Sequence, residues 1–167
     1  MIKVSLLILL SSLSLPSFAV EPLSADGLIF GVTPGTYVGS DVLNMVVKPK
    51  YKSTRILEGN RINAHTDANL GSFKMSVSAI LQIQPTGNGR FNMYEVGVAN
   101  PGSGSGFCDA EKCHFDIAGL NNGTLTLHET WKVTDTGFDI VEGSQTMEEL
   151  GFIGIDASYV GKFHRQP

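Results

Sequence analysis

One stretch of alternation, Phe73 to Gln84, constrains the fold of this chain more than any other feature. Every second residue in it is apolar, and these residues are Phe73, Met75, Val77, Ala79, Leu81 and Ile83. The residues between them are polar, with the exception of Ile80. Because a β-strand turns successive side chains to opposite faces, this period of two predicts one long strand with a packed face and a hydrated face.

The residues that follow predict a hairpin. Pro85 to Gly89 is rich in turn formers, and Arg90 to Val98 starts a second strand. The apolar residues of this second strand change face along it: Phe91 and Met93 lie on one side, and Tyr94, Val96 and Val98 lie on the other. This change predicts a bulge or a twist near Glu95.

The same alternation predicts further strands, most clearly from Thr124 to Thr134. The other expected strands are 35–39 with its extension 42–47, 51–57, 114–118, 138–143 and 157–165. Two stretches without clear periodicity, 61–70 and 100–106, are expected to be loops. Thr146 to Glu149 has capping-box spacing, which predicts one or two helical turns before the last strand.

These elements predict an all-β fold, an antiparallel up-and-down β-barrel of about eight strands. Regular strand spacing with Gly/Asn turns also fits a sandwich. Closure into a barrel removes exposed strand edges, which favours the barrel. The tripeptides Tyr37-Val38-Gly39 and Tyr159-Val160-Gly161 are expected to face each other across the closing seam.

The first residues have the pattern of a secretory signal. Lys3 is followed by a short apolar run from Val4 to Leu15, and Ser17-Phe18-Ala19 places small residues at a cleavage site. The expected organisation is a signal peptide at 1–19, an irregular segment at 20–34 and a single barrel domain at 35–167. The protein is therefore predicted to be exported, to a periplasm or to the extracellular space, without stable membrane insertion after cleavage.

Charge and cysteine usage narrow the functional classes. The chain has 167 residues, a net charge of −4 and no Lys/Arg cluster, which argues against nucleic acid as a partner. In an oxidising compartment Cys108 and Cys113 are expected to form a disulfide that holds the loop between them. A redox or metal-binding pair would need Cys-x-x-Cys spacing or a second pair of ligands.

The order of elements from Gly35 to Arg165 resembles that of lipocalins and the wider calycin barrels. That family opens its first strand with Gly-x-Trp, places a helix before the last strand, and sets a late arginine over the first-strand aromatic residue. Gly35-Thr36-Tyr37 has this pattern with Tyr in place of Trp, and Thr146 to Leu150 and Arg165 stand where the helix and arginine would be. The resemblance implies an eight-stranded barrel that binds a small apolar molecule in its interior.

Glu129 is the most informative single residue. It shares a strand face with Leu127 and Trp131, where an unpaired carboxylate would be costly to bury. It is either a polar contact in a ligand cavity, a carboxylic acid with a raised pKa, a partner in a salt bridge to a neighbouring strand, or a residue exposed at the rim.

The candidate ligand-binding residues are Trp131, Glu129, Phe73, Met75, Tyr37 and Arg165. The large apolar side chains among them equally predict a filled core, because small barrels are more often filled by side chains than hollow.

Motifs for catalysis and for metal binding are missing from the sequence. Gly102 to Gly106 lacks the central serine of a nucleophile elbow and the following helix and lysine of a phosphate loop. The four histidines, at 65, 114, 128 and 164, have no metal-ligand spacing. No catalytic residue, cofactor or metal is therefore predicted.

Two functions remain from these observations. The first is an exported barrel that binds a small hydrophobic or amphipathic ligand. The alternative is a secreted protein-interaction module, such as an inhibitor, adhesin or host-directed factor, with a filled core and no cavity.

Overall fold

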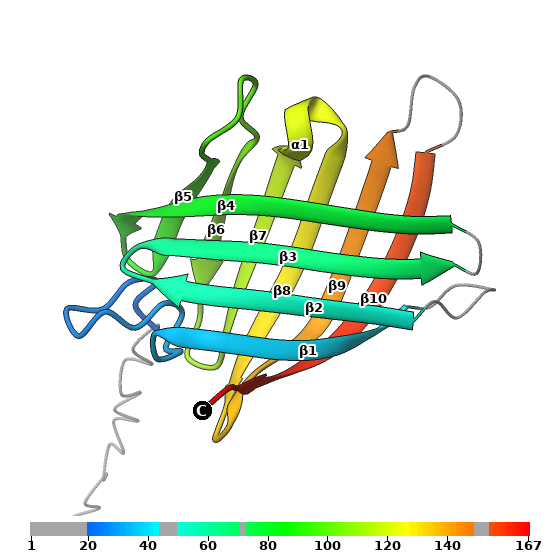
Figure 1. Ribbon diagram of the computed structural model, residues 1–167. Coiled ribbons are helices and arrows are strands. Elements are labelled where there is room, and N and C mark those ends of the chain that lie inside the picture. The colour runs from blue at the N-terminus through cyan, green and yellow to red at the C-terminus, as the bar shows by residue number, and fades with distance from the viewer. Residues whose placement is uncertain (1–19, 44–49, 71–72, 149–153) are drawn as a thin grey trace, which may run out of the picture.

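The computed structural model describes residues 20–43, 50–70, 73–148 and 154–167, which form a closed antiparallel barrel of ten strands (Figure 1). The elements are β1 (Gly35–Leu43), β2 (Lys50–Glu58), β3 (Arg61–Leu70), β4 (Phe73–Gly87), β5 (Arg90–Glu95), β6 (Ser103–Cys108), β7 (Lys112–Gly119), α1 (Leu120–Gly123), β8 (Leu125–Thr134), β9 (Gly137–Glu148) and β10 (Gly154–Arg165). Each strand pairs with the next in the chain, and β1 pairs with β10 to close the barrel. The predicted signal peptide at 1–19 lies outside the described residues.

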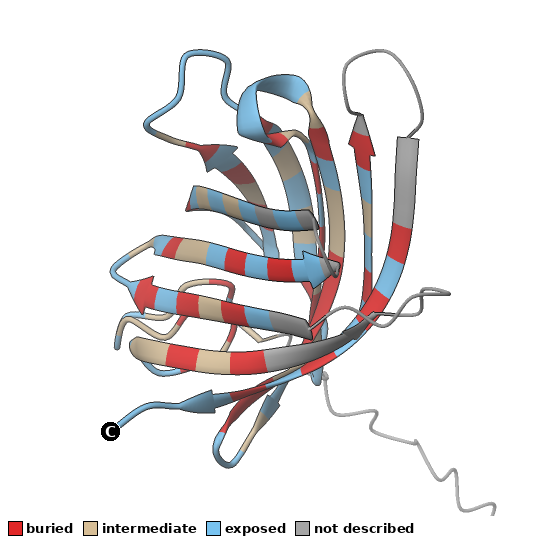
Figure 2. Cartoon of the chain, turned by 45° about the vertical axis from the view of Figure 1, so that its right-hand side comes forward, coloured by how far each residue is buried: buried red, intermediate tan, exposed pale blue. Residues whose placement is uncertain are grey.

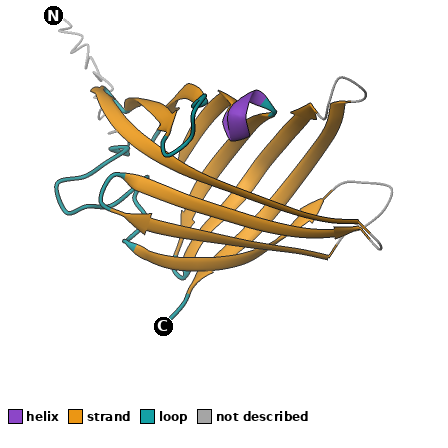
Figure 3. Cartoon of the chain, turned by 45° about the horizontal axis from the view of Figure 1, so that its top comes forward, coloured by secondary structure: helices purple, strands orange, loops and turns teal. Residues whose placement is uncertain are grey.

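The strands of the barrel cross in two layers. Strands β1 to β4 run across the front of the molecule, and β7 to β10 run behind them at a steep angle (Figures 1 and 3). Buried and exposed residues alternate along the strands, so that one face of each strand lines the interior (Figure 2). The predicted all-β antiparallel barrel is thus confirmed, and β4, at 15 residues, is its longest described strand.

The barrel has ten strands instead of about eight, because both stretches expected to be loops contain strands. In β3 the inward residues Ala64, Thr66 and Ala68 are small or polar, which hides the alternation. In β6 the glycines are required by packing: a Cβ on Gly104 would clash with the backbone of Asp116 on β7. Because the first four residues of β6 are serine and glycine, the sequence predicts a loop where the structure has a strand.

The structure has a short helical turn earlier in the chain than the last strand, α1 at Leu120–Gly123. This turn lies between β7 and β8 and not directly before β10. Asn121 and Asn122 have positive φ angles of 52° and 60°, a left-handed backbone that asparagine tolerates. The helix expected at Thr146–Leu150 is wrong at its start, because Thr146 to Glu148 belong to β9; the remaining two positions lie outside the described residues.

The predicted bulge near Glu95 is absent from the described pairing. Glu95 continues the inward face of Phe91 and Met93, and β5 ends there. Instead, both neighbours of β9 show a register shift, next to Val141 and Glu142. Because of this shift, Phe138 and Ile140 face inward before it, and Gly143 and Gln145 face inward after it.

The closing seam joins the two strands that carry the Tyr-Val-Gly tripeptides, as predicted, but the register of their pairing differs from the prediction. Strand β1 pairs with β10, but Tyr37 lies opposite Arg165, and Tyr159 lies opposite Leu43. The two Tyr-Val-Gly tripeptides therefore do not face each other.

Residues 20–34 close one end of the barrel. Ile29 and Val32 exchange backbone hydrogen bonds of 3.0 and 2.8 Å, which makes a hairpin with Phe30 and Gly31 at its tip. Both tip residues have positive φ, 55° and 78°, as a type I′ turn requires. Phe30 is fully buried against the rings of Phe91, Phe115 and Trp131.

Candidate functional site

The interior of the barrel is divided into two parts. We call the end closed by Phe30 the aromatic half, and it contains Phe30, Tyr37, Phe91, Phe115, Trp131, Phe138 and Phe163. Trp131 stacks on Phe138 with ring centres 4.0 Å apart, and Phe138 stacks on Phe163 at 4.7 Å. These seven rings fill this half of the interior, as small barrels usually are filled.

Between the two halves lies a buried polar cluster centred on Glu129. The Glu129 carboxylate is 1% exposed and accepts three hydrogen bonds. Tyr159 Oη donates to Oε1 at 2.6 Å, Trp131 Nε1 donates to Oε2 at 2.6 Å, and Arg55 Nη2 donates to Oε1 at 3.2 Å. Of the explanations considered for Glu129, a salt bridge is therefore observed, but its partner lies on β2 across the barrel and not on a neighbouring strand. The exposed rim position is wrong.

The position of Tyr159 in this cluster depends on a glycine. Glu129 on β8, Gly143 on β9 and Tyr159 on β10 lie directly opposite one another in the sheet. A Cβ on Gly143 would come within 2.5 Å of the Tyr159 ring. The ring can therefore lie across β9 and bring its hydroxyl to Glu129 only because position 143 has no side chain.

Arg55 reaches the cluster from β2, on the other side of the barrel. Its Nη1 donates to Ser53 Oγ at 2.6 Å and to Thr66 Oγ1 at 3.4 Å. Its guanidinium carbon lies 5.5 Å from the centre of the Phe163 ring. The guanidinium is thus held by β2, β3, β8 and β10, and its charge is balanced by Glu129 inside the barrel.

Beyond the cluster, the second half of the interior contains a cavity, and we call this part the cavity half. The cavity offers about 40 Å³ to the centres of water-sized molecules, which is room for about three waters. Its lining residues are Arg55, Ala64, Thr66, Val77, Ala79, Leu81, Leu120, Leu125, Leu127, Gln145 and Tyr159. Ala64, Val77, Ala79 and Leu127 face the interior but are only half-buried, so solvent reaches them from the α1 end.

The structure separates the predicted ligand-binding residues. Glu129 and Trp131 meet in the polar cluster. Tyr37 is buried in the aromatic half, where its hydroxyl donates to the Thr33 carbonyl at 2.8 Å. Arg165 is exposed at the same end and donates to the Pro34 carbonyl at 2.9 Å.

Phe73 and Met75, the remaining predicted ligand-binding residues, belong to β4, but their side chains lie outside the described part.

A second hollow lies at the end where Tyr37 and Arg165 are found. It has a volume of about 400 Å³ and lies between residues 31–33 and the turn that joins β8 to β9. This larger volume belongs to an open surface groove, and the Tyr37 and Arg165 groups beside it already bond to backbone carbonyls. The enclosed cavity with its polar cluster is therefore the better candidate site.

Three buried polar residues were missed from the sequence. Arg55 and Tyr159 complete the cluster, and Glu95, 2% exposed, accepts hydrogen bonds from the backbone N–H groups of Gly102 and Asn121. Glu95 shows the same sequence pattern as Glu129: each is a carboxylate at a position where the alternation of the strand places apolar residues. The outward and inward faces of β2 differ too little in polarity to reveal Arg55.

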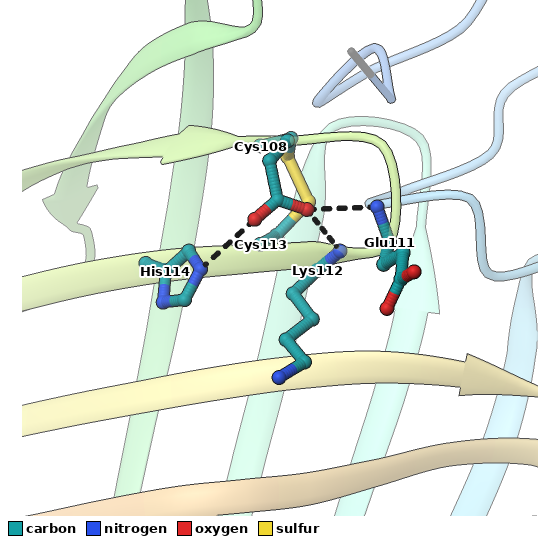
Figure 4. The surroundings of a disulfide bond; sticks show 6 residues. Cys108, Glu111, Lys112, Cys113 and His114 are labelled. Atoms are coloured by element: carbon teal, nitrogen blue, oxygen red, sulfur yellow. Dashed lines mark hydrogen bonds and ion pairs between the residues drawn. A yellow bond between two sulfur atoms is a disulfide. The ribbon is translucent and has the colours of Figure 1, made fainter. Parts of the chain in front are cut away.

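The cysteines form the predicted disulfide, in the turn between β6 and β7 (Figure 4). Asp109 accepts hydrogen bonds from the backbone N–H groups of Glu111 and Lys112 at 2.7 and 2.8 Å. These two hydrogen bonds, with His114 nearby, lower the pKa of the Asp109 carboxyl. The turn is also tied to the closing segment, since the Val20 N–H donates to the Asp109 carbonyl at 2.8 Å.

The described outer surface carries a Ser-His-Asp arrangement of nucleophilic type. His65 lies between Ser78 Oγ, 2.7 Å from its Nδ1, and Asp67 Oδ2, 3.2 Å from its Nε2. The three side chains stand exposed on β3 and β4, whose backbone N–H groups pair within the sheet and cannot stabilise an oxyanion. The trio therefore lacks the surroundings that a catalytic triad needs.

Two further features are missing from the described part of the chain. No group of three or more His, Cys, Asp and Glu side chains there could hold a metal ion. No helix there is long and apolar enough to cross a membrane.

The disulfide is compatible with an exported protein.

Comparisons of this chain with protein-family models, with curated proteins and with solved structures found no match, so the resemblance to lipocalins stays a prediction.

Proposed function

We propose that this protein is an exported carrier or sensor that binds a small amphipathic ligand in the cavity half of its barrel. The observation that supports this most is the incomplete burial of residues that face the interior. Four residues line the cavity and remain half-buried: Ala64, Val77, Ala79 and Leu127. By contrast, the side chains that face the interior in the aromatic half are buried.

The chemistry of the lining supports the same proposal. Apolar side chains form the walls, and a few convergent polar groups lie at the base, the combination typical of small-molecule sites. The volume of about 40 Å³ limits the enclosed part of the ligand to about three or four non-hydrogen atoms. A longer ligand would extend from the cavity toward α1.

Binding is tested by titrating the protein with short-chain alcohols, ketones, esters and acids, with isothermal calorimetry as the readout. The variant Ala79→Leu places extra carbon atoms in the cavity and is expected to abolish binding without unfolding the protein. Ala118→Leu makes the same change on the outer face of β7, where the residue is exposed, and is expected to bind as the wild type does.

Two results would contradict the proposal. One is an absence of binding across the whole panel, which would favour the filled interaction module. The other is binding that Ala79→Leu leaves unchanged, which would place the ligand elsewhere.

A further inference from the structure

We infer that the cavity is selective for the neutral hydrogen-bonding end of a small amphiphile, such as an alcohol, ketone, ester or amide, and excludes carboxylates and amines. This inference rests on the proposed function and specifies its ligand class. It follows from the charges that the cavity already contains.

The charge at the base of the cavity is balanced before any ligand enters. Arg55 is the only charged residue among the described lining residues, and Glu129 lies 3.2 Å from its Nη2. Both side chains are buried, at 6% and 1% exposure. A ligand carboxylate beside them would add a second negative charge in a poorly hydrated interior, with one guanidinium for two anions.

A ligand cation is excluded by the same cluster. The Glu129 carboxylate accepts hydrogen bonds from Tyr159, Arg55 and Trp131. Tyr159 and Arg55 stand between this carboxylate and the cavity, since they line it and Glu129 does not. An ammonium group would therefore meet the guanidinium of Arg55 first, and two positive charges repel each other.

The remaining polar group suits a neutral partner. Gln145 lines the cavity and is half-buried, and within the described part of the chain its carboxamide has no hydrogen-bond partner. A carboxamide both donates and accepts, so it pairs with hydroxyl, carbonyl or amide groups without requiring a charge. The register shift in β9 is what turns this residue inward.

A series of matched length tests this selectivity. The wild-type protein is titrated at pH 7 with 1-hexanol, 2-hexanone, hexanoate and hexylamine. Dissociation constants come from calorimetry, and the indole N–H signal of the single tryptophan serves as a local reporter. Because Trp131 donates to Glu129, its signal is expected to shift when a ligand binds beside the cluster.

The two neutral compounds are expected to bind at least about tenfold more tightly than hexanoate and hexylamine. Glu129→Gln removes one negative charge beside Arg55, so the ratio of hexanoate to hexanol affinity is expected to rise by at least about tenfold. Glu142→Gln, the same substitution at an exposed position of β9, is expected to leave this ratio unchanged.

Different results separate the two levels of the proposal. Wild-type binding of hexanoate within threefold of hexanol overturns the charge-selectivity inference and leaves the proposed function standing. A ratio of hexanoate to hexanol affinity that is unchanged in folded Glu129→Gln overturns the charge-selectivity inference as well, and it also leaves the proposed function standing. If circular dichroism shows that Glu129→Gln does not fold, the wild-type ratio alone decides. Absence of binding by all four compounds counts against the proposed function, and the inference falls with it.

Discussion

The aromatic half and the cavity half of this barrel belong to the same closed sheet but are filled in opposite ways. In the aromatic half, Phe30 enters from outside the barrel and packs against three buried rings. In the cavity half, β3 and β4 contribute Ala64, Val77 and Ala79, which are too short to meet across the interior. One end of the same sheet is therefore packed with rings, and the other contains the cavity in which we propose that a ligand binds.

The polar cluster lies where the two halves meet. Trp131 belongs to the aromatic half, Arg55 and Tyr159 line the cavity, and Glu129 joins all three. A buried ion pair is a poor source of stability by itself, because desolvation offsets most of the attraction. Its presence here is consistent with the recognition role that we propose for the cluster.

Removing Glu129 alone gives the largest expected effect on this comparison. Glu129→Leu removes the carboxylate that pairs with the buried Arg55 guanidinium, and is expected to lower the free energy of unfolding by about 3–5 kcal/mol. The double variant Arg55→Leu/Glu129→Leu removes both charges and is expected to recover a large part of that loss. Urea unfolding measures both, and a loss below about 1 kcal/mol in the single variant would contradict the buried pair.

Truncating one apolar residue in each half tests the difference in packing directly. Phe30→Ala is expected to lower the free energy of unfolding by about 3–5 kcal/mol, because it leaves a void among buried rings. Leu127→Ala in the half-buried wall of the cavity is expected to cost about 1–2 kcal/mol, since solvent already reaches that side chain. Equal losses in urea unfolding would show that the two halves are packed alike.

Reducing the disulfide is expected to lower the stability of the protein, with the largest local effect in the aromatic half, where the turn between β6 and β7 lies. The loop between Cys108 and Cys113 is short, so its closure contributes about 2 kcal/mol. Unfolding of the wild type with and without a reductant measures this contribution. Hydrogen exchange should accelerate more in β6 and β7 near the turn than in β3 and β4; equal acceleration throughout would mean that the halves unfold together.

The smallest expected effect is a pH dependence at Asp109. Its pKa is lower in the folded protein than in the unfolded chain, so its stabilisation is present above about pH 4 and lost as the pH falls through the folded pKa. Because the side chain is 51% exposed, Asp109→Asn is expected to cost less than about 1 kcal/mol at pH 7.

The difference in stability between wild type and Asp109→Asn should shrink toward zero as the pH is lowered through the folded pKa. Asp26→Asn, at an exposed position, serves as the control and should show no such trend. A difference that grows on acidification would contradict the assigned hydrogen bonds.

The sequence by itself determined the sheet class, the disulfide and the importance of Glu129. These features follow from local pattern: the alternation along β4 and β8, the two cysteines, and one carboxylate in phase with apolar neighbours. Glycine and serine in β6 and small residues in β3 concealed two strands, because alternation is visible only where the two faces differ in polarity. The bulge expected near Glu95 is not observed, because β5 ends at Glu95 and the residues that follow are not part of the strand.

Only the tertiary structure decided how the site is assembled. Arg55 and Glu129 are 74 residues apart and meet across the interior, a contact that depends on barrel closure and register. The shift in β9 turned Gly143 and Gln145 inward, which made room for Tyr159 and gave the cavity its amide. Such features depend on how distant strands align, and spacing along the chain carries no information about that alignment.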